Sequence, residues 1–550
     1  MKRKVGSIRL AALASLTIFA ALVVPAAASA GEADLELYSA TVDEGELGTL
    51  TVGGYDIAAA EPAGDATRVD LVLSAGERAE LEREGLEVEL VRDPQGRTAS
   101  QRAAAQAAGG FDVWRDYDGP DGIARELRRV VRNHPEIAQL HVLGETHQGR
   151  KILAVRLTRN PDANPVGSRP SVLYQGTTHA REWISTEVTR RLLRHFVNGS
   201  DSSDSVRRML QEREMWFVPV VNPDGYQYTF DQERLWRKNL RDNNGDGQIT
   251  VGDGVDLNRN YPEHWNYEDE GSSSEPSSDT YRGPAAASEP ETQANMELVE
   301  QIPFSFALTY HSYGRLLLYP EGWQVQTPSR DDPIYQALTG TDAEPAVPGF
   351  DPDLAAELYT VNGDFTDWAH GEQETLAWTP ELAQGCRGCG FVFPDNEDRV
   401  QKEFEDNLPF ALDLVRSARR PAKPHSHLGN TTEPFYLETV SGDETRAHNP
   451  GSDFRFSLSY GDPQPVEVLA KRSLGEVDVH YRINGGAEQT AATSEWDGGE
   501  AYGERHDVYY HQLRGEVTGT DPGDEVEVWF EGGDKRSESF TYTAASESGA

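Results

Sequence analysis

Short apolar segments alternate with helical segments from about Phe111 to Arg419. The apolar segments predict strands at Leu140–Leu143, Lys151–Leu157, Val172–Gln175, Trp216–Val221, Phe304–Tyr310 and Thr375–Thr379. Helices are expected at Gly122–Asn133 and Glu182–Val197, and apolar residues recur every four positions in the second. This alternation indicates an α/β domain at 109–418, built on a mixed, mostly parallel twisted sheet that helices flank.

A smaller unit precedes this domain. Residues 31–108 predict strands at Gly48–Val52, Arg68–Leu73 and Leu86–Val91 around a helix at Ala75–Glu84, which is an α+β pattern. The polar stretch 93–110 contains Arg97 and Arg102. It fits a linker that a protease cuts, and composition equally allows an ordinary interdomain tether.

The C-terminal part of the chain changes character. Residues 419–434 are rich in Pro, His and small residues and are expected to be a linker. Residues 435–550 predict short strands between Gly, Asp and Asn turns, at Arg455–Tyr460, Glu476–Ile483, Val508–Leu513, Glu525–Phe530 and Ser537–Tyr542. An all-β sandwich is the expected fold of this part.

Residues 1–30 are typical of a secretory signal peptide. Lys2, Arg3, Lys4 and Arg9 precede an apolar run, and Ala28-Ser29-Ala30 provides small residues for cleavage. The alternative is a membrane anchor, but the run is short for a bilayer core. Cleavage would make the net charge of the 550-residue chain more negative, from −41 to −45. Such acidity disfavours nucleic-acid and membrane-surface partners. From the signal peptide we expect a secreted protein, and we expect it to be a monomer.

Three residues at expected strand ends form a candidate zinc site. His179 is followed by Glu182 where a strand meets a helix, and His311 follows the strand Phe304–Tyr310. In open α/β sheets, ligands bind where loops converge at the carboxyl ends of strands. Two imidazoles and one carboxylate leave a zinc coordination position open for water, as a hydrolytic site requires. Glu381, after Thr375–Thr379, is placed to act as a base.

An ordered series of motifs carries a family resemblance from about residue 111 to 418. The motifs are Gly176-Thr-Thr-His-Ala-Arg-Glu-Trp183, Leu235-Trp-Arg-Lys238, Gly254-Val-Asp-Leu-Asn-Arg-Asn260, His311-Ser-Tyr313, Tyr359 with Gly363 and Asp367-Trp368, and Thr379-Pro-Glu-Leu382. The series resembles that of zinc metallocarboxypeptidases of the carboxypeptidase A type. The resemblance implies their fold, one zinc ion per catalytic domain, and hydrolysis of the C-terminal peptide bond of peptides. Residues 31–108 resemble the family's pro-region.

The resemblance also implies residue roles. His179, Glu182 and His311 would bind zinc, and Asp256 would orient His179. Glu381 would be the general base and Arg237 would neutralise the oxyanion. The substrate's carboxylate would be held by Asn258, Arg259 and Tyr359, and Arg181 would contact a residue further upstream.

The stretch 359–367 matches the family's pocket for the departing side chain. Thr366 would occupy the pocket floor, with Asp364 nearby, which resembles carboxypeptidase T. The hypothesis is mixed specificity: a neutral threonine admits Leu or Phe, and Asp364 pairs with Lys or Arg.

Two further features lie near these motifs. Residues 242–253 place Asp242, Asn244, Asp246 and Asp253 at positions 1, 3, 5 and 12 of an EF-hand-like calcium loop, although a polar Asn/Gly turn is the alternative. Cys386 and Cys389 are the only cysteines, and a small local disulfide fits a secreted protein better than a redox motif.

Two other functions compete with this one. A silent binding module would keep the fold for adhesion through the β-domain, but it would not require Glu381 and Arg237. A cell-wall peptide hydrolase would keep the chemistry, whereas the Asn258-Arg259 pair favours ordinary peptide C termini.

Overall fold

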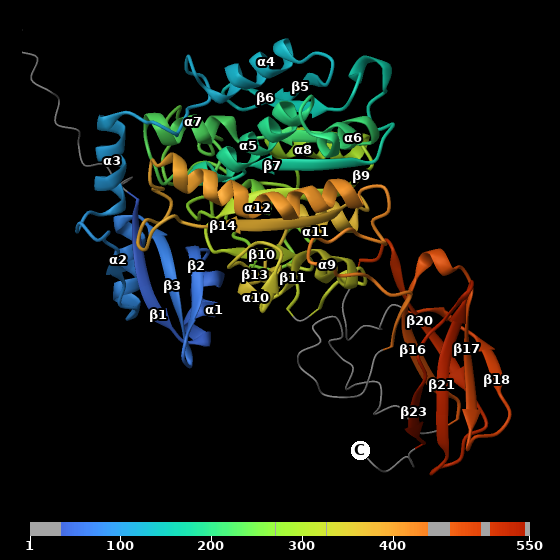
Figure 1. Ribbon diagram of the computed structural model, residues 1–550. Coiled ribbons are helices and arrows are strands. Elements are labelled where there is room, and N and C mark those ends of the chain that lie inside the picture. Colours follow the sequence, from blue (N-terminus) through green and yellow to red (C-terminus); the bar gives the residue numbers. More distant parts are fainter. Residues whose placement is uncertain (1–34, 270, 326, 438–461, 497–505, 545–550) are drawn as a thin grey trace, which may run out of the picture.

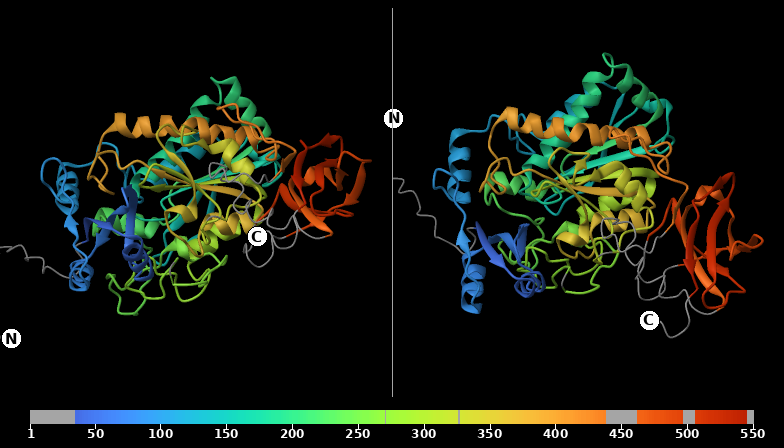
Figure 2. Two further views of the ribbon diagram at one scale, coloured as in Figure 1. Left: turned by 90° about the horizontal axis from the view of Figure 1, so that it is seen from below. Right: turned by 60° about the horizontal axis from the view of Figure 1, so that its bottom comes forward.

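The computed structural model describes residues 35–544, except 270, 326, 438–461 and 497–505. Figure 1 shows a central α/β region, with an N-terminal region (blue) and a C-terminal β-region (red) at its sides. The same two regions lie at opposite ends of the molecule in both views of Figure 2. The expected signal peptide and the expected strand Arg455–Tyr460 lie outside the described residues. The domain boundaries stay predictions.

The central region is built on an eight-stranded sheet of order β13-β10-β14-β9-β7-β8-β6-β5. Four neighbouring pairs are parallel, and β10·β14, β6·β8 and β5·β6 are antiparallel. The mixed, mostly parallel sheet is therefore confirmed. In chain order the strands are β5 (Ala138–Glu145), β6 (Lys151–Leu157), β7 (Ser171–Gly176), β8 (Glu214–Val218), β9 (Phe304–Ser312), β10 (Leu316–Tyr319), β13 (Asp351–Leu354) and β14 (Leu376–Leu382).

Helices cover both faces of this sheet. Successive side chains of β7 point to opposite faces, and each face packs into its own apolar core. Val172 and Tyr174 pack with α5 and α12, whereas Leu173 packs with α8 and α11 on the other face. The short strands β11 (Gly340–Thr341) and β12 (Glu344–Pro345) form a separate two-stranded antiparallel sheet. The helices are α4 (Ile123–Asn133), α5 (Trp183–Gly199), α6 (Asp204–Glu212), α7 (Pro223–Asp231), α8 (Pro290–Gln301), α9 (Asp332–Thr339), α10 (Ala355–Leu358), α11 (Phe365–Gly371) and α12 (Glu397–Ser417).

The N-terminal region is a four-stranded antiparallel sheet of order β2-β3-β1-β4 with its own core. Its strands are β1 (Glu36–Val42), β2 (Asp56–Ala63), β3 (Ala66–Leu73) and β4 (Glu89–Leu90), and its helices are α1 (Glu44–Val52), α2 (Ala75–Glu84) and α3 (Ala99–Gly109). The α+β prediction and the helix 75–84 are confirmed.

The structure differs from two local expectations in this region. The expected strand Gly48–Val52 is the second half of α1, because Asp43 and Glu46 form a reciprocal capping box that starts a helix there. The expected linker 93–110 contains α3, which begins with a second capping box between Thr98 and Gln101 and continues through alanines.

The C-terminal region consists of two antiparallel sheets around one apolar core, as expected for a β-sandwich. Its strands are β15 (Phe435–Leu437), β16 (Gln464–Lys471), β17 (Val477–Ile483), β18 (Gln489–Ala492), β19 (Ser494–Glu495), β20 (Tyr510–Val517), β21 (Glu525–Gly532), β22 (Lys535–Arg536) and β23 (Phe540–Thr543). Across the described residues, none of the helices is both long and apolar enough to span a membrane.

Candidate active site

Three potential metal ligands meet at the carboxyl edge of the central sheet. His179 follows β7, Glu182 directly precedes α5, and His311 is the penultimate residue of β9. Nδ1 of His179 lies 3.0 Å from Nδ1 of His311 and 2.8 Å from Oε1 of Glu182. Nδ1 of His311 lies 3.3 Å from Oε2 of Glu182, and all three side chains are buried. The structure thus brings the predicted trio together.

These three residues fit a zinc ion. Their ligand atoms lie within 4.8 Å of one another, and two histidines with one glutamate are a known donor set of catalytic zinc sites. Two Nδ1 atoms that face each other can share only one proton, whereas a metal ion would give each of them a bond. Burial, and next the charge of Arg237, lower the pKa of His179. This favours the neutral imidazole, which is the form that binds metals.

Asp256 organises the rear of this trio. Its Oδ1 lies 3.1 Å from Nε2 of His179, and its Oδ2 accepts hydrogen bonds from Nε and Nη2 of Arg237 at 3.1 and 2.8 Å. The backbone N–H of Asn258 donates to Oδ1 as well, at 2.9 Å. One buried carboxylate therefore fixes both the orientation of the histidine ring and the position of the guanidinium.

Glu381 stands beside His311. It is the penultimate residue of β14, and the parallel register of β14 and β9 pairs it directly with His311. Burial raises the pKa of Glu381 to about 7, and the neighbouring Glu182 adds to this against the charge of His311. A carboxylate at this position is tuned for proton transfer near neutral pH.

The residues expected to bind a substrate carboxylate lie on neighbouring segments. Asn258 and Arg259 belong to the 3-10 turn Leu257–Arg259, and the side chain of Asn258 accepts a hydrogen bond from the N–H of Phe365 at 3.1 Å. Gly363 precedes this contact with a φ of 69°, and a Cβ there would lie 2.7 Å from the carbonyl oxygen of Arg259. Only glycine permits this close approach without strain.

The expected pocket residues form the start of α11. Asp364 is its N-cap: Oδ2 accepts from the N–H and the hydroxyl of Thr366 at 3.0 and 2.5 Å, and Oδ1 accepts from the N–H of Asp367 at 3.2 Å. Burial raises the pKa of Asp364. The carboxylate is thus held in place by the helix it caps.

A cavity of about 550 Å³ joins these groups. With the exception of Asp256, which lies behind His179, every predicted catalytic, zinc-binding and substrate-binding residue lines it: His179, Arg181, Glu182, Arg237, Asn258, Arg259, His311, Tyr359, Asp364, Thr366 and Glu381. The N-terminal region lines the cavity too, through β2 and Arg68 of β3. One side of the cavity therefore belongs to the N-terminal region.

Arg181 is engaged by this N-terminal region. Its guanidinium forms a two-point ion pair with Asp56, in which Nη2 lies 2.8 Å from Oδ1 and Nη1 contacts Oδ2. Burial would raise the pKa of Asp56, but the charge and hydrogen bonds of Arg181 outweigh it and lower that pKa. Nearby, the hydroxyl of Tyr313 donates to Asp70 at 3.0 Å. Sequence reasoning missed both contacts, since nothing in the local sequence distinguishes these two aspartates.

Side-chain oxygens of the loop 242–253 accept hydrogen bonds from N–H groups of the loop's own backbone. Asp242 accepts from the N–H groups of Gly245 and Gly247 at 2.7 and 2.8 Å, and Asp253 accepts from those of Asn243 and Thr250, each at 2.9 Å. Asn244 and Asp246 make similar turns. Calcium binding here stays a prediction.

Cys386 and Cys389 form the expected disulfide, and Cys386 lies on the cavity wall. Arg102 of α3 is buried against this loop, where it donates to the carbonyl oxygens of Gly388, at 3.2 Å, and of Cys389. The disulfide loop is therefore also a contact of the N-terminal region.

Comparison with known proteins identifies the family. The model of the peptidase M14 family, described as zinc carboxypeptidase, matches residues 123–409, and the chain belongs to this family. Zinc carboxypeptidase A 1 of Anopheles gambiae is 33% identical over 322 residues, which cover 57% of this chain and 70% of that protein. Metallocarboxypeptidase A of Arthroderma otae is 31% identical over 318 residues, or 56% and 72% of the two chains.

Solved structures agree on the fold. Thrombin activatable fibrinolysis inhibitor matches with a TM-score of 0.56 and 19% identity over 70% of this chain and 99% of that chain. Carboxypeptidase A from Helicoverpa armigera matches with a TM-score of 0.55 and 22% identity over 70% and 98%. The carboxypeptidase A resemblance, the zinc requirement and the hydrolysis of C-terminal peptide bonds are confirmed by the family, and a binding module is not favoured.

Proposed function

We propose that the cavity is the site at which this metallocarboxypeptidase cleaves peptides, with the residue roles that the motifs imply. The observation that carries the proposal is the convergence of His179, Glu182, His311 and Glu381 at one edge of the sheet, inside a cavity that also contains Arg259. Zinc held by the first three would supply Lewis-acid activation of a water molecule and of the scissile carbonyl.

The chain's own residues then position the substrate and move protons. Arg259, with Asn258 and Tyr359, binds the free carboxylate of the peptide, so only the last peptide bond reaches the reacting position. Glu381 takes a proton from the attacking water and delivers it to the leaving amine. Arg237, held in place by Asp256, stabilises the negative charge that develops on the carbonyl oxygen.

Glu381→Gln tests this assignment. It should lower kcat for blocked dipeptides by about 1,000-fold, the order expected when a general base is lost, while the bound zinc stays unchanged. The matched control is Glu344→Gln, because Glu344 is an exposed glutamate that does not line the cavity. A chelator should abolish the wild-type activity, and zinc should restore it. Wild-type turnover by Glu381→Gln would overturn the mechanism.

For the terminal residue we propose mixed specificity. Thr366 presents a small neutral side chain to the cavity, and Asp364 offers a carboxylate beside it. Peptides that end in Phe, Leu and Arg should all be cleaved, and Asp364→Asn should reduce kcat/KM for Arg far more than for Phe. A preference for peptides that end in Glu would contradict this proposal.

We also propose that the protein is made as a secreted, inactive precursor. The support is the N-terminal region, which lines the cavity and occupies Arg181 with Asp56, so an upstream substrate residue and Asp56 compete for the same guanidinium. Residues 1–30 would direct secretion, and the secreted protein would be a monomer.

Calcium bound at loop 242–253 would stiffen the segment between Arg237 and Asn258. Unchanged melting temperature and activity in a calcium chelator that spares zinc would argue against calcium.

A further inference from the structure

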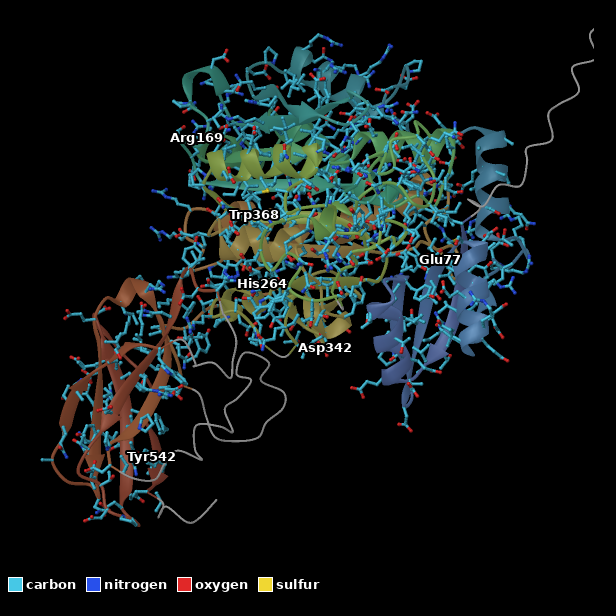
Figure 3. All side chains as sticks on the ribbon, turned by 180° about the vertical axis from the view of Figure 1, so that it is seen from behind. Glu77, Arg169, His264, Asp342, Trp368 and Tyr542 are labelled. Atoms are coloured by element: carbon cyan, nitrogen blue, oxygen red, sulfur yellow. A yellow bond between two sulfur atoms is a disulfide. The ribbon has the colours of Figure 1, made fainter. Side chains whose placement is uncertain are left out.

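A second group of histidines and carboxylates lies where the C-terminal region contacts the central region. Segment 506–510 of the C-terminal region is held by Asp331, whose carboxylate accepts the backbone N–H groups of Val508, Tyr509 and Tyr510 at 2.6, 2.8 and 3.0 Å. The ring of His264 lies 6.5 Å from that of His506, and in Figure 3 His264 is on the side of the central region that faces the sandwich, whereas Glu77 lies in the N-terminal region at the other end. This contact is therefore remote from the N-terminal region.

Glu321, His370 and His506 come together at this contact. Their ligand atoms lie within 4.8 Å of one another, although the first two residues belong to the central region and the third to the C-terminal region. Glu321 is fully buried, His370 is 1% exposed, and the side chain of His506 is 10% exposed. Two imidazoles and a carboxylate buried at an interface are a set of donors suited to a transition metal.

His370 has the same chemical setting as His179. Its Nε2 lies 3.0 Å from Oδ2 of Asp331, as Nε2 of His179 lies 3.1 Å from Oδ1 of Asp256. Its Nδ1 is buried and has no hydrogen-bond partner among the residues that the structure describes. A carboxylate on one ring nitrogen fixes the ring and leaves the other nitrogen available to a metal.

The charges around the cluster favour a cation. Nδ1 of His506 lies 2.9 Å from Glu321 and its Nε2 lies 3.3 Å from Glu263. Asp367 adds a third carboxylate, which accepts the N–H groups of Gly322 at 3.0 Å and of Trp323 at 3.1 Å. Buried carboxylates need a cation nearby, and one imidazolium would balance only one of them. The imidazoles select zinc over calcium or magnesium, which prefer oxygen ligands.

We propose that Glu321, His370 and His506 form a second zinc site, with a structural role, that fixes the C-terminal region to the central region. Glu263, on the opposite ring nitrogen of His506, would orient this ring as Asp331 orients that of His370. His370 is the penultimate residue of the short helix α11, so the site would tie this helix of the central region to the sandwich.

Zinc content tests the proposal directly. The full chain, produced without a histidine tag and saturated with zinc, is freed of excess metal and analysed by mass spectrometry for zinc per chain. Wild type should hold two equivalents, and His370→Gln and His506→Gln should each hold one. His311→Gln, which removes a ligand of the first site, should retain one. The matched control His511→Gln should hold two, because His511 is a sandwich histidine that pairs with Glu495.

Each outcome decides between two zinc sites and one. One equivalent in saturated wild type would overturn the proposal without any variant and would leave His506 as an imidazolium between two carboxylates. Two equivalents that survive both His370→Gln and His506→Gln would place the second ion elsewhere and would also overturn it. Peptide hydrolysis does not enter the count, so failure of the proposed catalytic roles leaves this result readable.

Discussion

The N-terminal and C-terminal regions both contact the central region, but they hold different parts of it. The N-terminal region reaches into the cavity, where Asp56 binds Arg181 and Asp70 accepts from Tyr313. The C-terminal region docks on Asp331, which hydrogen-bonds backbone N–H groups and does not line the cavity. The N-terminal region thus binds a side chain that a substrate would use, whereas the C-terminal region binds a part of the central region outside the cavity.

This difference indicates opposite fates for the two regions. A contact that occupies Arg181 disappears when a peptide needs the same guanidinium, so the N-terminal region and substrate exclude each other. The contact at Asp331 is compatible with a bound peptide, so the C-terminal region can remain during catalysis. Removing or weakening each contact, and measuring activity and stability separately, tests this difference between the two regions.

The largest effect is expected from cutting the chain before α3. Arg97 has a side chain that is 43% exposed, whereas Arg102 is buried inside α3, so limited trypsin digestion should cut first in loop 91–97. Hydrolysis of a blocked dipeptide should rise by about 1,000-fold, the ratio of a millimolar effective concentration of the tethered region to a micromolar affinity.

Sequencing the new N terminus and assaying the digest over time check this expectation. Glu381→Gln digested in parallel should be cut equally but stay inactive, which separates cleavage from catalysis. A first cut after Arg102, or a cut without a gain in hydrolysis, would contradict the role given to the N-terminal region.

Asp56→Asn should have the next largest effect. It leaves Arg181 buried without its charged partner, which weakens docking of the N-terminal region by about 3 kcal/mol and raises the activity of the uncut chain by roughly 100-fold. Glu82→Gln is the matched control, because the side chain of Glu82 is 43% exposed, pairs with Arg78 at 2.7 Å inside the same region and does not line the cavity. Equal activity of the two variants would show that the ion pair does not close the cavity.

Much of the active site could be predicted because its residues follow strands. His179, His311 and Glu381 each lie at the end of an apolar segment, and parallel strands bring such ends to one edge. The register that pairs Glu381 directly with His311 comes from the structure. Chemistry at strand ends is thus readable from a single sequence.

Contacts between regions could not be predicted in the same way. Asp56 is one of 92 acidic residues, and its pairing with Arg181 depends on how two separately folded units dock. His506 likewise meets Glu321 and His370 only when the sandwich docks. Local competition explains the misjudged helix α1, where the capping box at Asp43 outweighed the β-propensity of Leu50-Thr-Val52.

On the C-terminal side, Asp331→Asn should destabilise the protein without loss of turnover. An amide cannot accept all of the N–H groups that the carboxylate accepts, and its own N–H₂ would face donors, so docking should weaken by about 2 kcal/mol. We expect the melting temperature to fall by about 5 °C. Unchanged kcat for the activated enzyme at 25 °C is expected alongside, and a large loss of kcat would refute the view that this contact is remote from catalysis.

The smallest effect is expected from Arg472→Ala, which tests whether exposed charges matter at this end of the molecule. Arg472 lies 2.7 Å from both Glu495 and Asp507, but its side chain is 37% exposed, and that of Glu495 is 61% exposed. Exposed ion pairs contribute about 0–1 kcal/mol, so the melting temperature should change by less than about 2 °C. Thermal unfolding of Arg472→Ala and Asp331→Asn in the same buffer gives the comparison. A fall for Arg472→Ala as large as that for Asp331→Asn would mean that surface charge, rather than the buried carboxylate, holds segment 506–510 in place.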